Sequence, residues 1–158
     1  MVAAALALGF WILQILFPGD EKRIRKMLAD AAQTAGIKPN ENPLFKLAAA
    51  KKLVGFFSTD AVLKLDVSGV DVRSINGRED LLQAVTAARA SLQEARIQLR
   101  EIHVNVDLDK QSATAQLVAT AYLNGGSDPM LQELKLQLNK IDGKWKIARV
   151  DTVKTLGM

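Results

Sequence analysis

Residues 131–153 read LQELKLQLNKIDGKWKIARVDTV, and this stretch decides the fold. Apolar and polar residues alternate on both sides of the pair Asp142 and Gly143. An alternation with a period of two is typical of a half-buried β-strand, and Asp-Gly is a preferred two-residue hairpin turn. The stretch therefore predicts two antiparallel strands, 131–141 and 145–153, joined by a tight turn.

The same strand pattern continues upstream of this hairpin. Residues 113–123 alternate throughout, and residues 97–108 alternate with one change of phase near Arg100 and Glu101. One extra residue in a strand indicates a β-bulge, which bends the strand and curves the sheet. The second half of the chain therefore predicts a meander of four long antiparallel strands that is strongly curved.

Helical periods replace the alternation in the first half of the chain. Apolar residues recur at every third or fourth position over 20–35, and Gly36 follows as a helix-ending residue. Asn42 and Pro43 are a suitable N-cap and first residue for a second helix over 44–57. These two segments therefore predict consecutive helices joined by a short loop.

A third helix is predicted over 77–92, where Asn76 and Glu79 have the spacing of a capping box. Residues 61–67 and 70–75 precede it and predict two short strands. Helices that come before a run of strands favour an α+β fold, with the helices packed on one face of a strongly curved antiparallel sheet.

The first seventeen residues contain no charged side chain. A helix over 2–17 would be roughly 24 Å long at ~1.5 Å per residue, somewhat shorter than the ~30 Å hydrocarbon core of a bilayer. We expect residues 1–18 to be a membrane-anchor helix and residues 19–158 to be one folded domain. A cleaved signal peptide and a buried core helix are the two alternatives. The expected anchor side chains are Phe10, Trp11, Ile12, Ile15 and Phe17.

The composition argues against several classes of function. The chain has 158 residues and no cysteine, which excludes disulfides, thiol nucleophiles and thiolate metal sites. Its 21 basic and 17 acidic residues are spread along the chain, so we expect no nucleic-acid partner. His103 is the only histidine, and its alternation with Ile102 predicts that it points away from the core. Asp107 and Asp109 are expected to shape a turn, and we expect neither a metal nor a cofactor.

The ending IDGKWKIARV at 141–150, the residues Gly77, Arg78 and Glu79 that open the third helix, and the order of the elements carry a family resemblance. Over residues 20–156 the chain resembles the nuclear transport factor 2-like superfamily, and most of all a bacterial branch with one N-terminal membrane segment and a domain of unassigned role. The resemblance implies a cone-shaped half-barrel that encloses an apolar pocket. It also implies an outer sheet face that often forms a dimer. Members include ketosteroid isomerase, polyketide cyclases, dehydratases and binding domains, so the fold alone does not choose a function.

Candidate sites follow from side-chain type and strand phase. An isomerase or cyclase needs a buried base and a donor for the developing oxyanion, and the sequence offers no convincing pair. We therefore do not expect an enzyme. The candidate residues for an apolar ligand pocket are Phe56, Ala119, Ala121 and Tyr122. The candidate residues for a partner surface, which are polar and lie on the opposite strand face, are Gln116, Thr120, Lys135 and Gln137.

These observations lead to a membrane-tethered, non-enzymatic accessory or assembly subunit of a membrane complex. The alternative function is binding of a small apolar ligand in the cone, with isomerase or cyclase activity a distant third. Expected partners are the membrane and other subunits of the complex or a second copy of the chain. The basic residues of 22–26 would place the domain in the cytoplasm, whereas the resemblance implies the periplasmic side of a bacterial inner membrane, which we favour.

Overall fold

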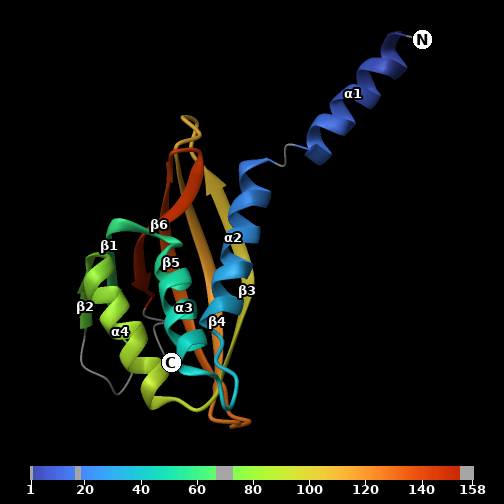
Figure 1. The fold of residues 1–158 in the computed structure, drawn as a ribbon. Helices are drawn as coiled ribbons and strands as arrows, with labels where there is room; N and C mark the ends of the chain where they lie inside the picture. The colour runs from blue at the N-terminus through green and yellow to red at the C-terminus, as the bar shows by residue number, and fades with distance from the viewer. Residues whose placement is uncertain (1, 17–18, 67–72, 154–158) are drawn as a thin grey trace, which may run out of the picture.

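The computed structural model describes residues 2–16, 19–66 and 73–153. Four helices and six strands make up this part of the chain (Figure 1). The helices are α1 (Val2–Leu16), α2 (Asp20–Ala35), α3 (Pro43–Val54) and α4 (Gly77–Ser91). The strands are β1 (Phe57–Leu65), β2 (Arg73–Asn76), β3 (Ala95–Val106), β4 (Ser112–Leu123), β5 (Met130–Ile141) and β6 (Lys144–Thr152).

The six strands form one open sheet in the order β2-β1-β6-β5-β4-β3. The helices α2, α3 and α4 lie on one face of this sheet (Figure 1). Strands β3 to β6 pair with their neighbours in antiparallel fashion, so the predicted four-stranded meander is confirmed. Strands β2 and β3 are the two edges of this sheet, so no other strand of the sheet lies along the outer side of β3.

The prediction of a purely antiparallel sheet is wrong at one position. Strand β1 pairs with β6 in parallel, through partners such as Leu63 and Val150, so the sheet is mixed. These two strands are separated by about half of the chain, and a connection of that length permits parallel pairing. The alternation of apolar and polar residues indicates which residues share one face of a strand, but it does not indicate which strands are neighbours in the sheet.

One predicted helix boundary and one predicted helix cap also change. Helix α3 ends at Val54 instead of residue 57, because the Gly55 N–H donates to the carbonyl oxygens of the last helical turn and the chain then turns into β1. Asn42 is the expected N-cap of α3, where its side-chain oxygen accepts from the Leu44 N–H at 2.8 Å. Asn76 makes no side-chain cap on α4, since it lies in β2 and its amide donates to Ser74. The predicted break between the strands of residues 61–67 and 70–75 lies outside the described residues.

The bulge predicted in β3 is confirmed. The pairing of β3 with β4 shifts between Arg100 and His103, and Glu101 has a positive φ of 53°. The bulge keeps Ile102 on the same sheet face as Leu99, which would otherwise alternate away from it. As a result β3 presents apolar side chains to the helices along its whole length, and His103 is exposed on the other face, as predicted.

The core lies where the sheet meets α2, and it contains Trp145. Ile24 and Leu28 of α2 are buried against Leu138 and Ile147 of the sheet. The Trp145 indole N–H donates to the Asp20 carboxylate at 3.0 Å, which fixes the first turn of α2 to the start of β6.

Helix α1 projects away from the rest of the molecule (Figure 1). Its 15 residues correspond to about 22 Å of helix, less than the ~30 Å of a bilayer core. Among the helices of the described chain, none is both long enough and apolar enough to span a membrane. The structure therefore does not support the prediction of a membrane-spanning helix at residues 1–18.

Candidate functional site

Helix α2 presents two different faces to its surroundings. Ile24, Leu28 and Ala31 are spaced three and four residues apart and are buried in the core. On the adjacent face, Arg25 Nη2 donates to the Ile102 carbonyl oxygen at the β3 bulge, over 2.9 Å, and so joins this face of the helix to β3. Residues one and two turns further along that face are alanines, at 29 and 32, so small side chains face the first half of β3.

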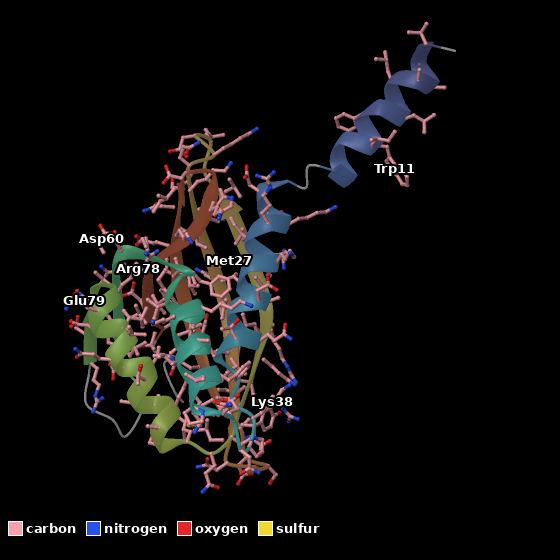
Figure 2. All side chains as sticks on the ribbon, viewed as in Figure 1. Trp11, Met27, Lys38, Asp60, Arg78 and Glu79 are labelled. Carbon is pink, nitrogen blue, oxygen red and sulfur yellow. The ribbon has the colours of Figure 1, made fainter. Side chains whose placement is uncertain are left out.

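A groove of about 1020 Å³ follows the C-terminal half of α2. Its apolar lining comes from α2, the loop after it, α3 and β3. These apolar residues are Ala29, Ala32, Ile37, Pro39, Phe45, Ala48, Ala49, Ala95, Ile97, Leu99 and Ile102. Figure 2 shows Lys38, another lining residue, at the end of the groove where the chain leaves α2.

The loop that follows α2, at one end of the groove, is held in place by backbone and side-chain hydrogen bonds. Ile37 forms an isolated antiparallel bridge with Ala95, with N–H to oxygen distances of 2.8 and 3.0 Å. Glu41 accepts from the Lys38 N–H at 2.9 Å and from Arg89 Nη2 of α4 at 2.8 Å. The side chains of Glu41 and Arg89 are only 5% and 4% exposed, so this is a buried ion pair. The groove therefore has a fixed end.

The carboxylates of the groove lack the arrangement that acid–base catalysis needs. Asp30, Glu41 and Glu94 line it, and Glu41 is committed to Arg89. The groove lining contains neither histidine nor tyrosine among the residues that the structure describes. No cluster of three or more possible metal ligands occurs in that part of the chain.

Lys146 is the one lysine whose ionisation is clearly perturbed among the described residues, and it lies outside the groove. Burial lowers the pKa of its ammonium group, and the nearby charges of Arg78 and Lys144 lower it further. Its Nζ donates to the Gly55 carbonyl oxygen at 2.6 Å, while Arg78 donates through two nitrogens to the Phe57 carbonyl oxygen. Both cations therefore fasten the turn between α3 and β1, which is a structural role.

A sequence model for the SnoaL-like domain matches residues 46–151. The chain belongs to this family. The matched region contains α4, almost the whole sheet and most of α3. It therefore includes β3, the strand that lines the groove. Among curated proteins, no sequence match was found.

Several solved structures share the fold predicted from the sequence. A protein from Novosphingobium aromaticivorans, described as NTF2-like with a cystatin-like fold, has a TM-score of 0.68 at 16% identity, covering 97% of this chain and 90% of its own. Another protein from that organism, provisionally named a scytalone dehydratase, has a TM-score of 0.67 at 13% identity, covering 87% and 85%. A protein of unknown function from Mycobacterium tuberculosis has a TM-score of 0.65 at 19% identity, covering 94% and 75%. At such identities the likeness shows the fold alone.

None of the four pocket residues predicted from the sequence lines the groove of this SnoaL-like domain, and three of them are cross-strand neighbours of lining residues. Ala119 and Ala121 pair across strands with Leu99 and Ile97, which are lining residues. Tyr122 carries the Arg96 guanidinium 4.5 Å above its ring centre. Phe56 packs against the core at the start of β1. The sequence reasoning missed the α2 wall, although alanines on the face beside Ile24 and Leu28 were a readable signal.

The predicted partner surface of the SnoaL-like domain divides into exposed and buried positions. Gln116 and Lys135 are exposed cross-strand neighbours on β4 and β5, and Gln137 is exposed further along β5. Thr120 is only 3% exposed and its hydroxyl has no partner among the described residues. Three of the four predicted residues are therefore accessible to a partner.

The predicted anchor side chains are exposed where the structure describes them. Phe10, Trp11 and Ile12 of α1 are 62%, 65% and 48% exposed. The side chain of Ile15 and the residue Phe17 lie outside the described part of the chain.

Proposed function

We propose that this SnoaL-like domain binds a small, largely apolar molecule in the groove along α2. The observation that carries the proposal is the groove itself, whose volume of about 1020 Å³ is at the upper end of the ~300–1000 Å³ typical of ligand sites. Most of its inner surface is apolar. Apolar lining with charged groups beside it is the usual composition of a ligand site.

The proposed activity is binding without chemical conversion. Glu41 is paired and buried, so it is not free to take a proton from a ligand. The lone histidine, His103, points to the other sheet face and does not border the groove. The names of the fold neighbours include enzymes, but a fold shared at such low identity does not carry an activity with it.

Filling the groove tests this proposal. Ala32→Leu places a larger side chain on the α2 face that borders the groove, and Ala87→Leu makes the same change on the exposed surface of α4. We expect a neutral fluorescent probe such as N-phenyl-1-naphthylamine to bind the full chain, and Ala32→Leu to raise its Kd at least about tenfold. Both variants keep α1, so the difference between them isolates the groove. Equal affinity in the two variants, or no binding to either, would overturn the proposal.

A second candidate function is attachment to a membrane as an accessory subunit, with α1 as the point of contact. The specific observation in its favour is the exposure of Phe10, Trp11 and Ile12 on a helix that lacks charged residues. Tryptophan and other amphipathic aromatic side chains are enriched at membrane–water interfaces. The domain would then dock a membrane-complex subunit or a second copy through the sheet face around Gln116 and Lys135.

Vesicle sedimentation tests this candidate. The full chain should sediment with phosphatidylcholine vesicles, and Phe10→Asn together with Ile12→Asn should release it. A matched control is Leu108→Asn together with Ile141→Asn, which removes exposed apolar side chains from strand turns. Wild-type protein that stays in the supernatant would overturn membrane attachment. Protease protection of the domain in spheroplasts would then separate the periplasmic from the cytoplasmic placement.

A further inference from the structure

Among the charged residues that line the groove, the basic side chains are more exposed to solvent than the acidic ones. The lining residues with exposed cationic side chains are Lys38, Lys52, Arg96 and Arg100. The carboxylates of the lining, at 30, 41 and 94, are all less exposed than these cations. None of the four cations forms an ion pair with a carboxylate of the described chain. The solvent-exposed rim of the groove, which we call its mouth, therefore carries positive charge. No carboxylate of the described chain forms an ion pair with these cations.

Counting the charges of the groove lining also gives a net positive charge. Glu41 is neutralised by Arg89, which leaves Asp30 and Glu94 as the uncommitted carboxylates. Four exposed cations thus stand against two carboxylates that are partly withdrawn from solvent. A ligand with an anionic group would find opposite charge at the mouth, whereas a cationic ligand would meet repulsion.

The edge position of β3 separates the apolar and cationic parts of the groove. Ile97 and Leu99 point to the sheet face that the helices cover, and Arg96 and Arg100 point to the opposite face. Both sets border the same groove because β3 is the last strand of the sheet. A ligand lying over this edge would contact apolar side chains at one end and guanidinium groups at the other.

The Arg96 guanidinium is already held in position. It lies 4.5 Å from the centre of the Tyr122 ring, a cation–π contact. Stacking uses the flat face of the guanidinium and leaves its N–H edge available, and that edge matches a carboxylate in a bidentate arrangement. Arg100 is four residues along the same strand face, roughly 13 Å away at ~3.3 Å per residue. Its guanidinium donates to the Gln98 side-chain oxygen over a long distance of 3.4 Å.

We propose that the groove selects apolar molecules that carry a carboxylate, of the class of free fatty acids. The hydrocarbon part lies along the α2 alanines and Ile97, and the carboxylate is held by the Arg96 guanidinium, with the charge of Arg100 further along the same strand face adding to the attraction. This inference rests on the proposed function, since it names the ligand class of the same groove.

The test compares dodecanoate with dodecanol, which share the hydrocarbon chain and differ in charge. Calorimetric titration of the full chain, below the micelle concentration, should give a dodecanoate Kd about tenfold lower than that of dodecanol, because the exposed ion pair with Arg96 contributes up to about fivefold and the charge of Arg100 adds to it. Arg96→Gln together with Arg100→Gln should bring the two Kd values within about twofold. Added salt should weaken dodecanoate binding and leave dodecanol binding unchanged.

A matched control removes the same charge elsewhere. Lys64→Gln together with Arg73→Gln changes two exposed cations of β1 and β2, and it should preserve the preference for dodecanoate. If this control abolishes the preference as well, net charge and not the site is responsible, and the inference fails. Circular dichroism should show all variants folded, since every changed side chain is exposed.

The remaining outcomes are also decisive. Equal binding of dodecanoate and dodecanol to the wild type would overturn the ligand class while leaving apolar binding intact. Binding of neither would overturn the proposed function too. A loss of binding to phosphatidylglycerol vesicles in the arginine variant, with dodecanoate binding unchanged, would assign the cations to lipid headgroups and overturn the inference.

Discussion

The space between the helices and the sheet is filled at one end of α2 and open at the other. Beside the N-terminal half of α2, Ile24 and Leu28 meet Leu138 and Trp145, and all four are buried. Beside the C-terminal half, alanines face β3 across the groove. The same helix and the same sheet build both ends. Side-chain size, rather than the fold, therefore decides where a cavity remains.

The two ends are also fastened differently. At the filled end the Asp20 carboxylate, 18% exposed, accepts from Lys140 Nζ at 2.9 Å and from the Trp145 indole. At the open end Arg89 is almost fully buried and donates to the carbonyl oxygens of Thr34 and Gly36 as well as to Glu41. The open end thus depends on one buried cation, whereas the filled end depends mainly on apolar packing.

Removing that cation should have the largest effect. Arg89→Met leaves the Glu41 carboxylate buried without its partner, and breaking a buried ion pair from one side costs about 3–5 kcal/mol. Urea unfolding measures the loss. The double variant Arg89→Met with Glu41→Met should recover part of it, because no unpaired charge remains. A single variant as stable as the wild type would show that the open end does not depend on this pair.

A cavity at the filled end should cost nearly as much. Leu138 is 0% exposed at the centre of β5, and Leu138→Ala should lower the free energy of unfolding by about 3 kcal/mol. Leu108→Ala is the matched control, since Leu108 is fully exposed in a turn and should change stability by less than ~0.5 kcal/mol. A loss below about 1 kcal/mol for Leu138→Ala would contradict the dense packing of this end.

The filled end could be predicted from the sequence because it obeys local periodicity. Alternation located β5 and β6, and the change of phase at Arg100 and Glu101 located the bulge. Each of these features is a property of residues close together in the chain. The family resemblance added the curvature, and the SnoaL-like match confirms the superfamily.

The open end could not be predicted in the same way because it depends on which elements are neighbours. Alternation on β4 singled out Ala119 and Ala121, whereas the groove lies against β3, one strand further out. The burial of Glu41 with Arg89 joins residues 48 positions apart, and no local pattern connects them. The parallel pairing of β1 with β6 escaped prediction for the same reason.

Adding volume at the filled end should be resisted. Ala115 is 0% exposed between the cross-strand neighbours Val104 and Leu136, so Ala115→Leu should overpack the core and cost about 2 kcal/mol. Thermal unfolding measures the change. An unchanged Tm would mean that spare volume exists beneath the sheet at this end as well.

The Asp20 contact should contribute a smaller, pH-dependent amount. The hydrogen bond from Lys140 lowers the pKa of Asp20 below its usual value, with further lowering from Trp145. A carboxyl group whose pKa is lower in the folded state stabilises fully above its unfolded pKa of about 3.9, and this contribution is lost as the pH falls through the folded pKa. Asp20→Asn should therefore cost about 1 kcal/mol at pH 7. The difference from wild type should shrink below about pH 4, and a difference that grows with acidity would contradict the assignment.

The substitution that overpacks the core should be tolerated in the groove, and this is the smallest expected effect on stability. Ala32→Leu adds the same atoms as Ala115→Leu but directs them into open space, so the free energy of unfolding should change by less than ~0.5 kcal/mol. Leucine is nearly as good a helix former as alanine, so α2 itself should be unaffected. A large loss of stability would mean that Ala32 touches a packed surface and that the groove closes in solution. An unchanged stability together with lost probe binding would separate the two ends of α2 most directly, because one is then closed to added volume and the other is open to it.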